Sequence, residues 1–310
     1  MHDRSWLTVP GDNETQLGAA LTSGADVIVI DLEATVAPSA KPRARQLALE
    51  WLEAHGKQIV EQRRTGRWVR INPLTSRIWR EDLLSVMAGA PDGIVVPKAL
   101  GPAQIQQIAA ELYELEQRFH IPTGATRILP VVGETAQAAL TIPAYLDASL
   151  PRLTGLTWAS PSLACSLGAT RERDDRGIWA DSFRFVRAQT LLTAAAREIV
   201  AIDTGFADLA DRQGLTAAAQ AARADGFAGM IAIDMAQVET INAVFTPSEA
   251  EVALAHAVVA AGTASDPGAD AQQRDRRTSD PAQLQTARRT IGLAPPTKPQ
   301  NSGRPILRSA

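Results

Sequence analysis

The sequence predicts an α/β fold, a closed (β/α)8 TIM barrel of parallel strands that alternate with helices. Short runs of almost continuously apolar residues recur along the chain, which is typical of strands buried on both faces of a parallel sheet. Segments with helical spacing of apolar residues separate these runs, and this alternation indicates the α/β class. The expected strands are Ser5–Val9, Val27–Leu32, Trp68–Ile71, Gly93–Val96, Arg127–Val132, Leu156–Ala159, Ile199–Ile202 and Met230–Ile233.

The segments between the expected strands carry apolar side chains at the spacing of one helix face. Asp12 and Thr216 are expected N-caps, because their side-chain oxygens can accept a hydrogen bond from the first helical turn. Gly24, Gly56 and Gly226 stand where helices commonly end. The expected helices are Asn13–Ser23, Ala40–His55, Glu81–Met87, Ala103–Phe119, Phe183–Glu198, Thr216–Ala224 and Ala236–Phe245.

Polar or turn-forming residues end nearly every expected strand, which favours the barrel over an open doubly wound sheet. Barrel enzymes place their chemistry at the carboxyl ends of the strands. The glycine fingerprints of dinucleotide-binding sheets and of phosphate-binding loops do not follow any of these strands. The residues at the expected strand ends are Asp31, Asn72, Lys98, Glu134, Ser160, Asp203 and Asp234.

Composition narrows the class of protein further. Hydrophobic residues make up 45% of the 310 residues, enough to bury one sizeable core. The net charge of -3 argues against a protein that binds nucleic acid or a membrane surface through bulk charge. Cys165 is the single cysteine, so an internal disulfide cannot form, and Met1–Leu7 carries no signal-peptide pattern. We therefore expect a cytoplasmic protein, with the apolar runs too short to cross a bilayer.

The chain changes character near Gly262. Residues 1–262 are expected to form the barrel domain with a C-terminal helical extension, Glu249–Ala261. Residues 263–310 are rich in Pro, Gln, Arg, Asp, Ser and Thr, a composition that predicts a disordered tail. Within this tail Ala282–Ile291 could form a short helix. The tail is expected either to be a solvated segment or to serve as an arm that orders on substrate or a neighbouring subunit.

Several short motifs occur in a fixed order along residues 4 to 260. They are Arg4-Ser5-Trp6-Leu7 with Val9-Pro10-Gly11, Asp31-Leu32-Glu33, Lys41 with Ala44-Arg45, Val69-Arg70-Ile71-Asn72-Pro73, Pro97-Lys98, Glu134-Thr135-Ala136, Leu163 with Leu167-Gly168-Ala169, Ala201-Ile202-Asp203, and Gly226-Phe227 with Gly229 and Gln237. This series resembles the citrate lyase β-subunit and malyl-CoA lyase branch of the HpcH/HpaI aldolase superfamily. The resemblance implies a TIM barrel that commonly assembles as a homotrimer.

The resemblance also implies an activity, the Mg²⁺-assisted cleavage of a carbon–carbon bond in a 3-hydroxyacyl-CoA. The substrate would be of the citramalyl-, malyl- or citryl-CoA type, and the partners an acyl-CoA thioester or a keto acid. Such a retro-Claisen or aldol cleavage passes through an enolate, whose charge a cation or an arginine can offset. A stand-alone lyase is expected rather than a subunit of a larger lyase complex.

Three residues carry the catalytic expectation that the resemblance implies. Arg70 would bind a substrate carboxylate, which its planar guanidinium can hold through two hydrogen bonds. Glu134 would be both a metal ligand and a neighbour of the substrate. Asp31, with Glu33, would complete an acidic rim that orders metal-bound waters. The structural alternatives are an ion pair of Arg70 with Asp31 or Glu33, and a helix-capping role for Glu134.

Four positions depart from the family pattern. The second metal ligand of the family is an Asp, and Ser162 stands in its place, so Mg²⁺ should bind weakly. Ala34 and Met230 also replace an expected acid and an expected lysine. Asp234 could be a relocated ligand. If it is not, the alternative to a lyase is a catalytically degenerate barrel that acts as a binding or regulatory protein.

Two further groups of residues have less specific interpretations. Lys41, Arg43 and Arg45 form a basic cluster that could meet the phosphates of CoA, although such runs are usually a solvated helix face. The four histidines lie away from the strand ends and have no metal-like spacing, so we expect none to be catalytic.

Overall fold

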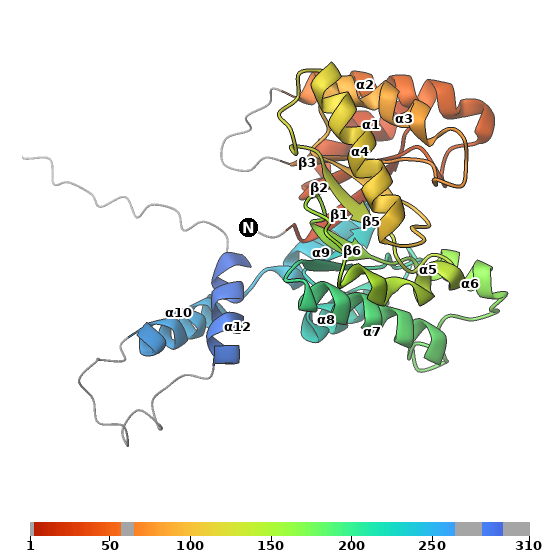
Figure 1. The fold of residues 1–310 in the computed structure, drawn as a ribbon. Helices are drawn as coiled ribbons and strands as arrows, with labels where there is room; N and C mark the ends of the chain where they lie inside the picture. Colours follow the sequence, from red (N-terminus) through yellow and green to blue (C-terminus); the bar gives the residue numbers. More distant parts are fainter. Residues whose placement is uncertain (1–2, 57–64, 264–280, 294–310) are drawn as a thin grey trace, which may run out of the picture. The chain divides into compact units, whose positions relative to one another are not determined.

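The computed structural model describes residues 3–56, 65–263 and 281–293 (Figure 1). The chain divides into two compact units, Asp3–Phe245 and a second unit that comprises Thr246–Ala310 with Met1–His2. The boundary expected at residue 262, which includes the C-terminal helical extension, stays a prediction. Residues 264–280 and 294–310, most of the expected tail, lie outside the described residues.

The first unit is a barrel of eight parallel strands, which confirms the predicted fold. The sheet order is β5-β4-β3-β2-β1-β8-β7-β6. The remaining gap is closed by two single bridges between the fifth and sixth strand regions, Ile128 with Leu153 and Val131 with Thr157. The strands are β1 Ser5–Pro10, β2 Val27–Asp31, β3 Gly66–Arg70, β4 Gly93–Val96, β5 Arg127–Pro130, β6 Gly155–Thr157, β7 Val200–Asp203 and β8 Gly229–Ala232.

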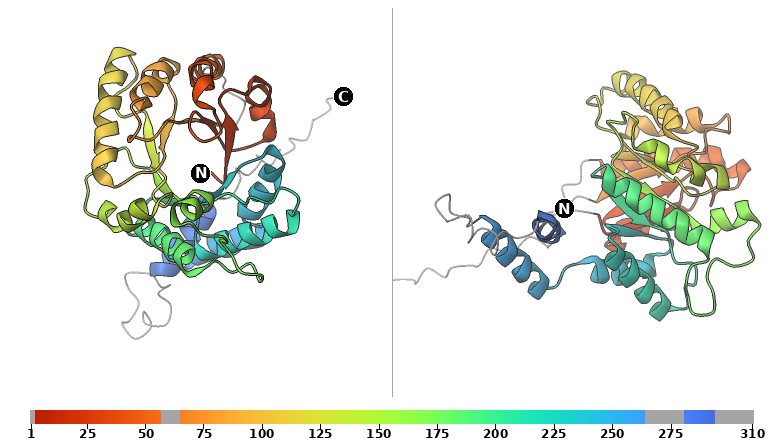
Figure 2. Two further views of the ribbon diagram at one scale, coloured as in Figure 1. Left: turned by 90° about the vertical axis from the view of Figure 1, so that its right-hand side faces the viewer. Right: turned by 60° about the horizontal axis from the view of Figure 1, so that its bottom comes forward.

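Helices surround the strands on the outside of the barrel (Figure 2, left). The α-helices of this unit are α1 Glu14–Ala19, α2 Lys41–His55, α3 Trp79–Val86, α4 Pro102–Arg118, α5 Ala136–Leu140, α6 Ser160–Leu167, α7 Asp181–Ala196, α8 Arg212–Asp225 and α9 Met235–Phe245. Four short 3₁₀ segments accompany them, η1 Ala20–Ser23, η2 Pro38–Ala40, η3 Met87–Gly89 and η4 Ile142–Tyr145.

Two expected caps were wrong by a few residues. Asn13, not Asp12, caps α1, because its side chain accepts a hydrogen bond of 3.0 Å from the backbone N–H of Gln16. Helix α8 begins earlier than expected, because the side chain of Asp211 caps it by accepting a hydrogen bond of 2.7 Å from the backbone N–H of Gly214. Thr216 lies inside that helix, and its hydroxyl donates to the carbonyl of Arg212. The side chain of Asp211, about one turn before Thr216, is therefore the N-cap of α8.

Apolar side chains form two separate cores, one on each side of the barrel wall. The larger core lies between strands and helices, and the smaller one fills part of the barrel interior. In the interior Trp6 and Trp68 meet edge to face, with ring centroids 4.9 Å apart. Gly93 makes room for Trp68, because a Cβ atom at this position would lie 2.4 Å from the indole ring.

A buried ion pair ties α4 to the segment before β6. Both carboxylate oxygens of Glu116 accept hydrogen bonds from Arg152, at 2.6 and 2.7 Å, and from the backbone N–H groups of Thr126 and Gly124. Burial alone would raise the pKa of Glu116, but these donors outweigh it and lower the pKa. These residues precede β5 and β6, at the end of the barrel associated with stability rather than catalysis.

Within the residues that the structure describes, the second unit contains two packed helices, α10 Glu249–Thr263 and α12 Pro281–Leu293. Both helices expected in this region are therefore present. They approach closely at Gly262, where a Cβ atom would lie 2.5 Å from the side chain of Leu284. No helix within the described ranges is long and apolar enough to span a membrane.

Candidate active site

A cavity of about 340 Å³ opens at the carboxyl ends of the barrel strands. Arg70 closes β3 at its edge, and Asp31 closes β2 beside it, since these two residues pair in register. Glu134 follows β5, and Ser162 lies in the first turns of α6. The parallel arrangement thus brings residues from four separate sequence regions to one rim, as expected for a barrel of this class.

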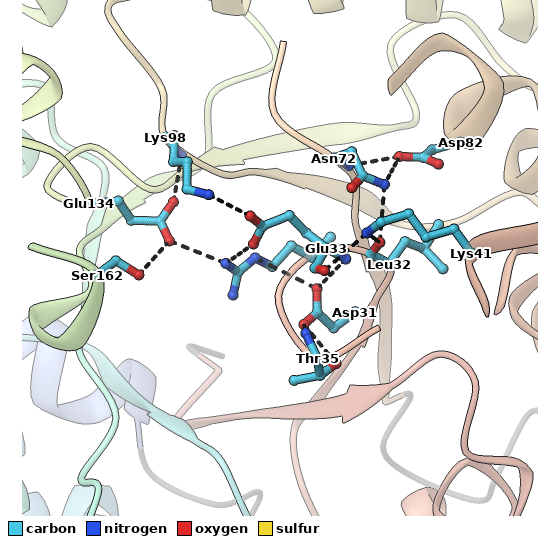
Figure 3. Close-up of polar contacts among 11 residues, drawn as sticks. Asp31, Leu32, Glu33, Thr35, Lys41, Asn72, Asp82, Lys98, Glu134 and Ser162 are labelled. Carbon is cyan, nitrogen blue, oxygen red and sulfur yellow. Dashed lines mark hydrogen bonds and ion pairs between the residues drawn. The ribbon is translucent and has the colours of Figure 1, made fainter. Parts of the chain in front are cut away.

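Arg70 is the centre of this rim, and Figure 3 draws the polar contacts among the rim residues. Its Nη2 atom donates hydrogen bonds to Glu33 and, at 3.2 Å, to Oε1 of Glu134. Its Nε atom lies 3.7 Å from Oδ1 of Asp31, an ion pair without a hydrogen bond. Burial opposes the charge of the guanidinium, but Asp31, Glu134 and Glu33 together raise the pKa of Arg70. The group is therefore a permanent cation.

Glu134 is almost fully buried, with 1% of its side chain exposed. Its Oε1 atom accepts from Arg70 and from the Ser162 hydroxyl, both at 3.2 Å, and Oε2 accepts from the backbone N–H of Lys98. Burial raises the pKa of Glu134 more than the Arg70 charge and the Lys98 N–H lower it. A buried carboxyl with a raised pKa beside a cavity is a candidate for proton transfer.

Lys98 is a rim residue that was not predicted as part of the site. Its Nζ atom donates to Oε1 of Glu33 at 2.7 Å, while the other oxygen of Glu33 binds Arg70. Glu33 thus bridges two cations. Lys98 also adopts a left-handed backbone conformation, with φ of 50°, which turns the chain just after β4. The sequence signal was the position of Pro97-Lys98 at a strand end.

Asp31 is fully buried and is occupied by its own loop. Oδ1 accepts from the N–H of Glu33 at 2.8 Å, and Oδ2 accepts from the N–H and hydroxyl of Thr35 at 3.0 and 2.9 Å. These bonds fix the segment between β2 and α2 and hold the carboxylate against Arg70. The geometry therefore gives Asp31 a positioning role toward the guanidinium.

The basic cluster at the start of α2 is used internally. Lys41 donates through Nζ to the carbonyls of Leu32 and Glu33, at 2.8 and 3.1 Å. Arg45 donates to the buried carboxylate of Asp82 at 2.8 Å. Lys41 and Arg45 therefore stabilise the rim loop, and their donors are not available to phosphates. Arg43, the third member of the cluster, is exposed as expected of a solvated face and lies 3.6 Å from the carboxylate of Glu14.

The donors around Glu134 do not fit a tightly held Mg²⁺ ion. No group of three His, Cys, Asp or Glu side chains able to hold a metal occurs among the described residues. Ser162 offers a neutral hydroxyl, whereas Mg²⁺ prefers carboxylates. Asp234 is not among the described residues that line the cavity. Its carboxylate accepts a hydrogen bond of 2.8 Å from the backbone N–H of Ala236 at the start of α9. The relocated-ligand hypothesis therefore gains no support here.

An eight-stranded parallel barrel with a guanidinium and carboxylates at its carboxyl rim belongs to the class of (β/α)8 barrels that bind ligands at that end. The sequence profile of the family HpcH/HpaI aldolase/citrate lyase matches residues 4–236. The chain belongs to this family.

Individual relatives cover most of the chain. It is 33% identical to a (3S)-malyl-CoA thioesterase of Cereibacter sphaeroides, in an alignment that covers 94% of each chain. It is 29% identical to the citrate lyase subunit beta of Leuconostoc mesenteroides, in an alignment that covers 83% of this chain and 82% of that subunit. The crystal structure of CitE from Mycobacterium tuberculosis in complex with magnesium, acetoacetate and coenzyme A has a TM-score of 0.68 and 28% identity. That likeness covers 94% of this chain and 98% of CitE.

Proposed function

We propose that the protein is a carbon–carbon lyase of the citrate lyase β-subunit type, which cleaves a 3-hydroxyacyl-CoA into an acyl thioester and a keto acid. The observation that carries this proposal is the meeting of Arg70 and Glu134, 3.2 Å apart, at the wall of one cavity. This cleavage requires two groups. One is a cation that holds the carboxylate of the substrate, and the other is a protein carboxylate that accepts the proton of the substrate hydroxyl.

Arg70 is proposed to bind the carboxylate of the keto-acid portion. Among the described residues, all hydrogen bonds of its side chain use Nη2, and Nε is buried without an acceptor. Nη1 makes no hydrogen bond to the described residues and can therefore donate to a ligand, whereas the buried Nε faces Asp31. A carboxylate suits these donors, because its two oxygens can accept two parallel hydrogen bonds from the planar guanidinium.

Glu134 is proposed to be the base. It takes the proton of the C3 hydroxyl, whose O–H electrons form the new carbonyl at C3. The C2–C3 bond breaks, and its electron pair moves to C2 to give the thioester enolate. The proton on Glu134 then passes to C2, so that an acyl thioester and a keto acid leave. Asp31 does not touch the substrate in this scheme but holds Arg70 in place.

The magnesium that structures of CitE contain would find at this rim the carboxylate of Glu134 with the Ser162 hydroxyl beside it. The other two rim carboxylates are already engaged, Asp31 by its own loop and Glu33 by Arg70 and Lys98. We therefore propose weak Mg²⁺ binding, with the positive charge at the rim supplied by Arg70.

Thioester hydrolysis is a second candidate activity. It is favoured by the Cereibacter relatives, which are named thioesterases and align over 94% of this chain. For hydrolysis Glu134 would take a proton from water, the hydroxide would attack the thioester carbonyl, and the thiolate would leave and be protonated. The cavity supplies the same base and the same cation for this reaction.

An assay with malyl-CoA, citramalyl-CoA and citryl-CoA separates these functions, because the products differ. A lyase forms a keto acid without releasing a free thiol, whereas a thioesterase releases free CoA thiol without a keto acid. The proposal predicts keto-acid formation on at least one substrate, lost in Arg70→Met. Free thiol as the sole product would favour hydrolysis. No turnover, with binding retained, would leave the degenerate binding barrel as the function.

We also propose that the protein assembles as a homotrimer through its C-terminal helices. Leu254 on α10 supports this, because this large apolar residue is 68% exposed in the single chain. Burial of this side chain against a neighbouring subunit would stabilise the assembly through the hydrophobic effect.

A further inference from the structure

The cavity at the rim extends from the carboxyl ends of the strands into the interior of the barrel. Besides the rim residues, its wall includes one mid-strand side chain from each of five strands. These are Trp6, Val29, Val95, Leu129 and Ile231. Barrel interiors are normally filled by layers of side chains. Here part of that interior is open space, continuous with the place where Arg70 and Glu134 meet.

The apolar wall begins directly beside the guanidinium. In register, Arg70 on β3 pairs with Val95 on β4, and Val95 pairs with Leu129 on β5. Both apolar residues also line the cavity. A ligand whose carboxylate binds Arg70 therefore has its adjoining carbon atoms against hydrocarbon on this side.

Few polar groups are available on the deep wall. Thr157 donates its hydroxyl proton to the carbonyl of Ile202 at 2.9 Å, and Thr8 adds one more hydroxyl. An ordered water molecule needs two to four polar partners. The deep part of the cavity is thus better suited to an apolar group than to ordered water.

The size of the cavity exceeds the needs of the smallest keto acid. An apolar cavity of about 150 Å³ in another protein accommodates benzene. The cavity here measures about 340 Å³, of which a carboxylate and carbonyl at the rim would fill only a part. The remaining space can take a branched alkyl or phenyl group.

We propose that the keto-acid portion of the substrate carries an apolar branched-alkyl or phenyl substituent, which enters the barrel interior against Val95 and Leu129. This inference rests on the proposed function, because it takes the carboxylate of the substrate to bind Arg70. It assigns Val95 as a specificity-determining residue and separates this protein from enzymes whose keto-acid product is glyoxylate.

The test is a calorimetric titration of the full chain with four 2-keto acids: glyoxylate, pyruvate, 3-methyl-2-oxobutanoate and phenylpyruvate. Burial of the larger groups should make one of the last two bind about tenfold or more tightly than glyoxylate. Val95→Phe should remove that preference, because it should weaken binding of the two larger acids far more than binding of glyoxylate. Leu140→Phe, at an exposed position, is the matched control. Val95→Ile, a smaller enlargement, replaces Val95→Phe if the latter does not fold.

The outcomes distinguish the two proposals. If glyoxylate binds as tightly as the larger acids, and Arg70→Met abolishes binding of all of them, the apolar-substituent proposal is overturned and the proposed function stands. If none of the four acids binds, carboxylate recognition by Arg70 fails, and both proposals fall with it.

Discussion

Arg70 and Glu134 lie 64 residues apart in the sequence, yet their side chains meet at 3.2 Å inside the mouth of the barrel. Glu134 is fixed from three directions, by Arg70, by Ser162 and by the backbone of Lys98. The guanidinium is fixed in turn by Glu33 and Asp31. This cluster is preorganised, so that binding a substrate need not order it.

Arg70→Lys is expected to lower kcat/KM for hydroxyacyl-CoA cleavage by about 10²–10³-fold, because an ammonium group cannot replace the two parallel donors of the guanidinium. Steady-state kinetics with the preferred thioester checks this. Arg80→Lys, on an exposed ion pair with Glu111, is the matched control and should change little. Equal rates for Arg70→Lys and the wild type would exclude carboxylate binding by Arg70.

Glu134→Gln is expected to stabilise the fold at pH 8 while it abolishes the base. The pKa of Glu134 is raised in the folded state, so its ionised form costs stability once the pH rises above the unfolded value, near 4.5. The gain in the free energy of unfolding should therefore vanish near pH 4. Urea denaturation at both pH values measures it, with exposed Glu53→Gln as the control. Destabilisation at pH 8 would contradict the pKa direction.

Ser162→Asp is expected to increase the affinity for Mg²⁺ by at least about tenfold, because it gives Glu134 a second carboxylate beside it. Calorimetric titration of Mg²⁺ into wild type and variant checks this. Ser166→Asp, on the same helix α6, adds the same charge outside the cavity wall and should leave the affinity unchanged. Tight Mg²⁺ binding by the wild type would show that the weak-metal proposal is wrong.

Glu116→Gln is expected to lower the free energy of unfolding at pH 7 by about 3–5 kcal/mol, because it leaves the buried Arg152 without its counter-charge. The pKa of Glu116 is lowered in the folded state, so its stabilisation is present above the unfolded value and is lost as the pH falls. The difference between wild type and variant should shrink as the pH falls below 4. A difference independent of pH would refute the ionic origin.

Light scattering is expected to give the mass of a trimer for the full chain. Leu254→Asp should reduce this mass, because it places a charge at the exposed apolar position on α10. An Ala→Asp change at exposed Ala253 provides a control on the same helix. A monomeric wild type would contradict the proposed assembly.

The barrel could be predicted because its strands are buried on both faces and therefore read as apolar runs. The same pattern located Asp31, Arg70 and Glu134, since the polar residue that ends each run must lie at the carboxyl rim. Helix α5 was not expected, because five residues are too few for a helical period to be recognised.

What the sequence could not predict are contacts set by tertiary geometry. The bridge from Glu33 to both Arg70 and Lys98 depends on the turn of the chain after β4. The internal use of Lys41 depends on two backbone carbonyls that no sequence pattern marks. The open interior of the barrel likewise follows from packing and not from the order of apolar residues.

A crystal structure of the protein soaked with a 2-keto acid tests the central claim most directly. We expect the acid in the barrel mouth, with its carboxylate within hydrogen-bond distance of the Arg70 guanidinium and its carbonyl facing Glu134. A keto acid bound elsewhere on the molecule, with Arg70 still paired only to Glu33 and Glu134, would exclude Arg70 as the carboxylate-binding group.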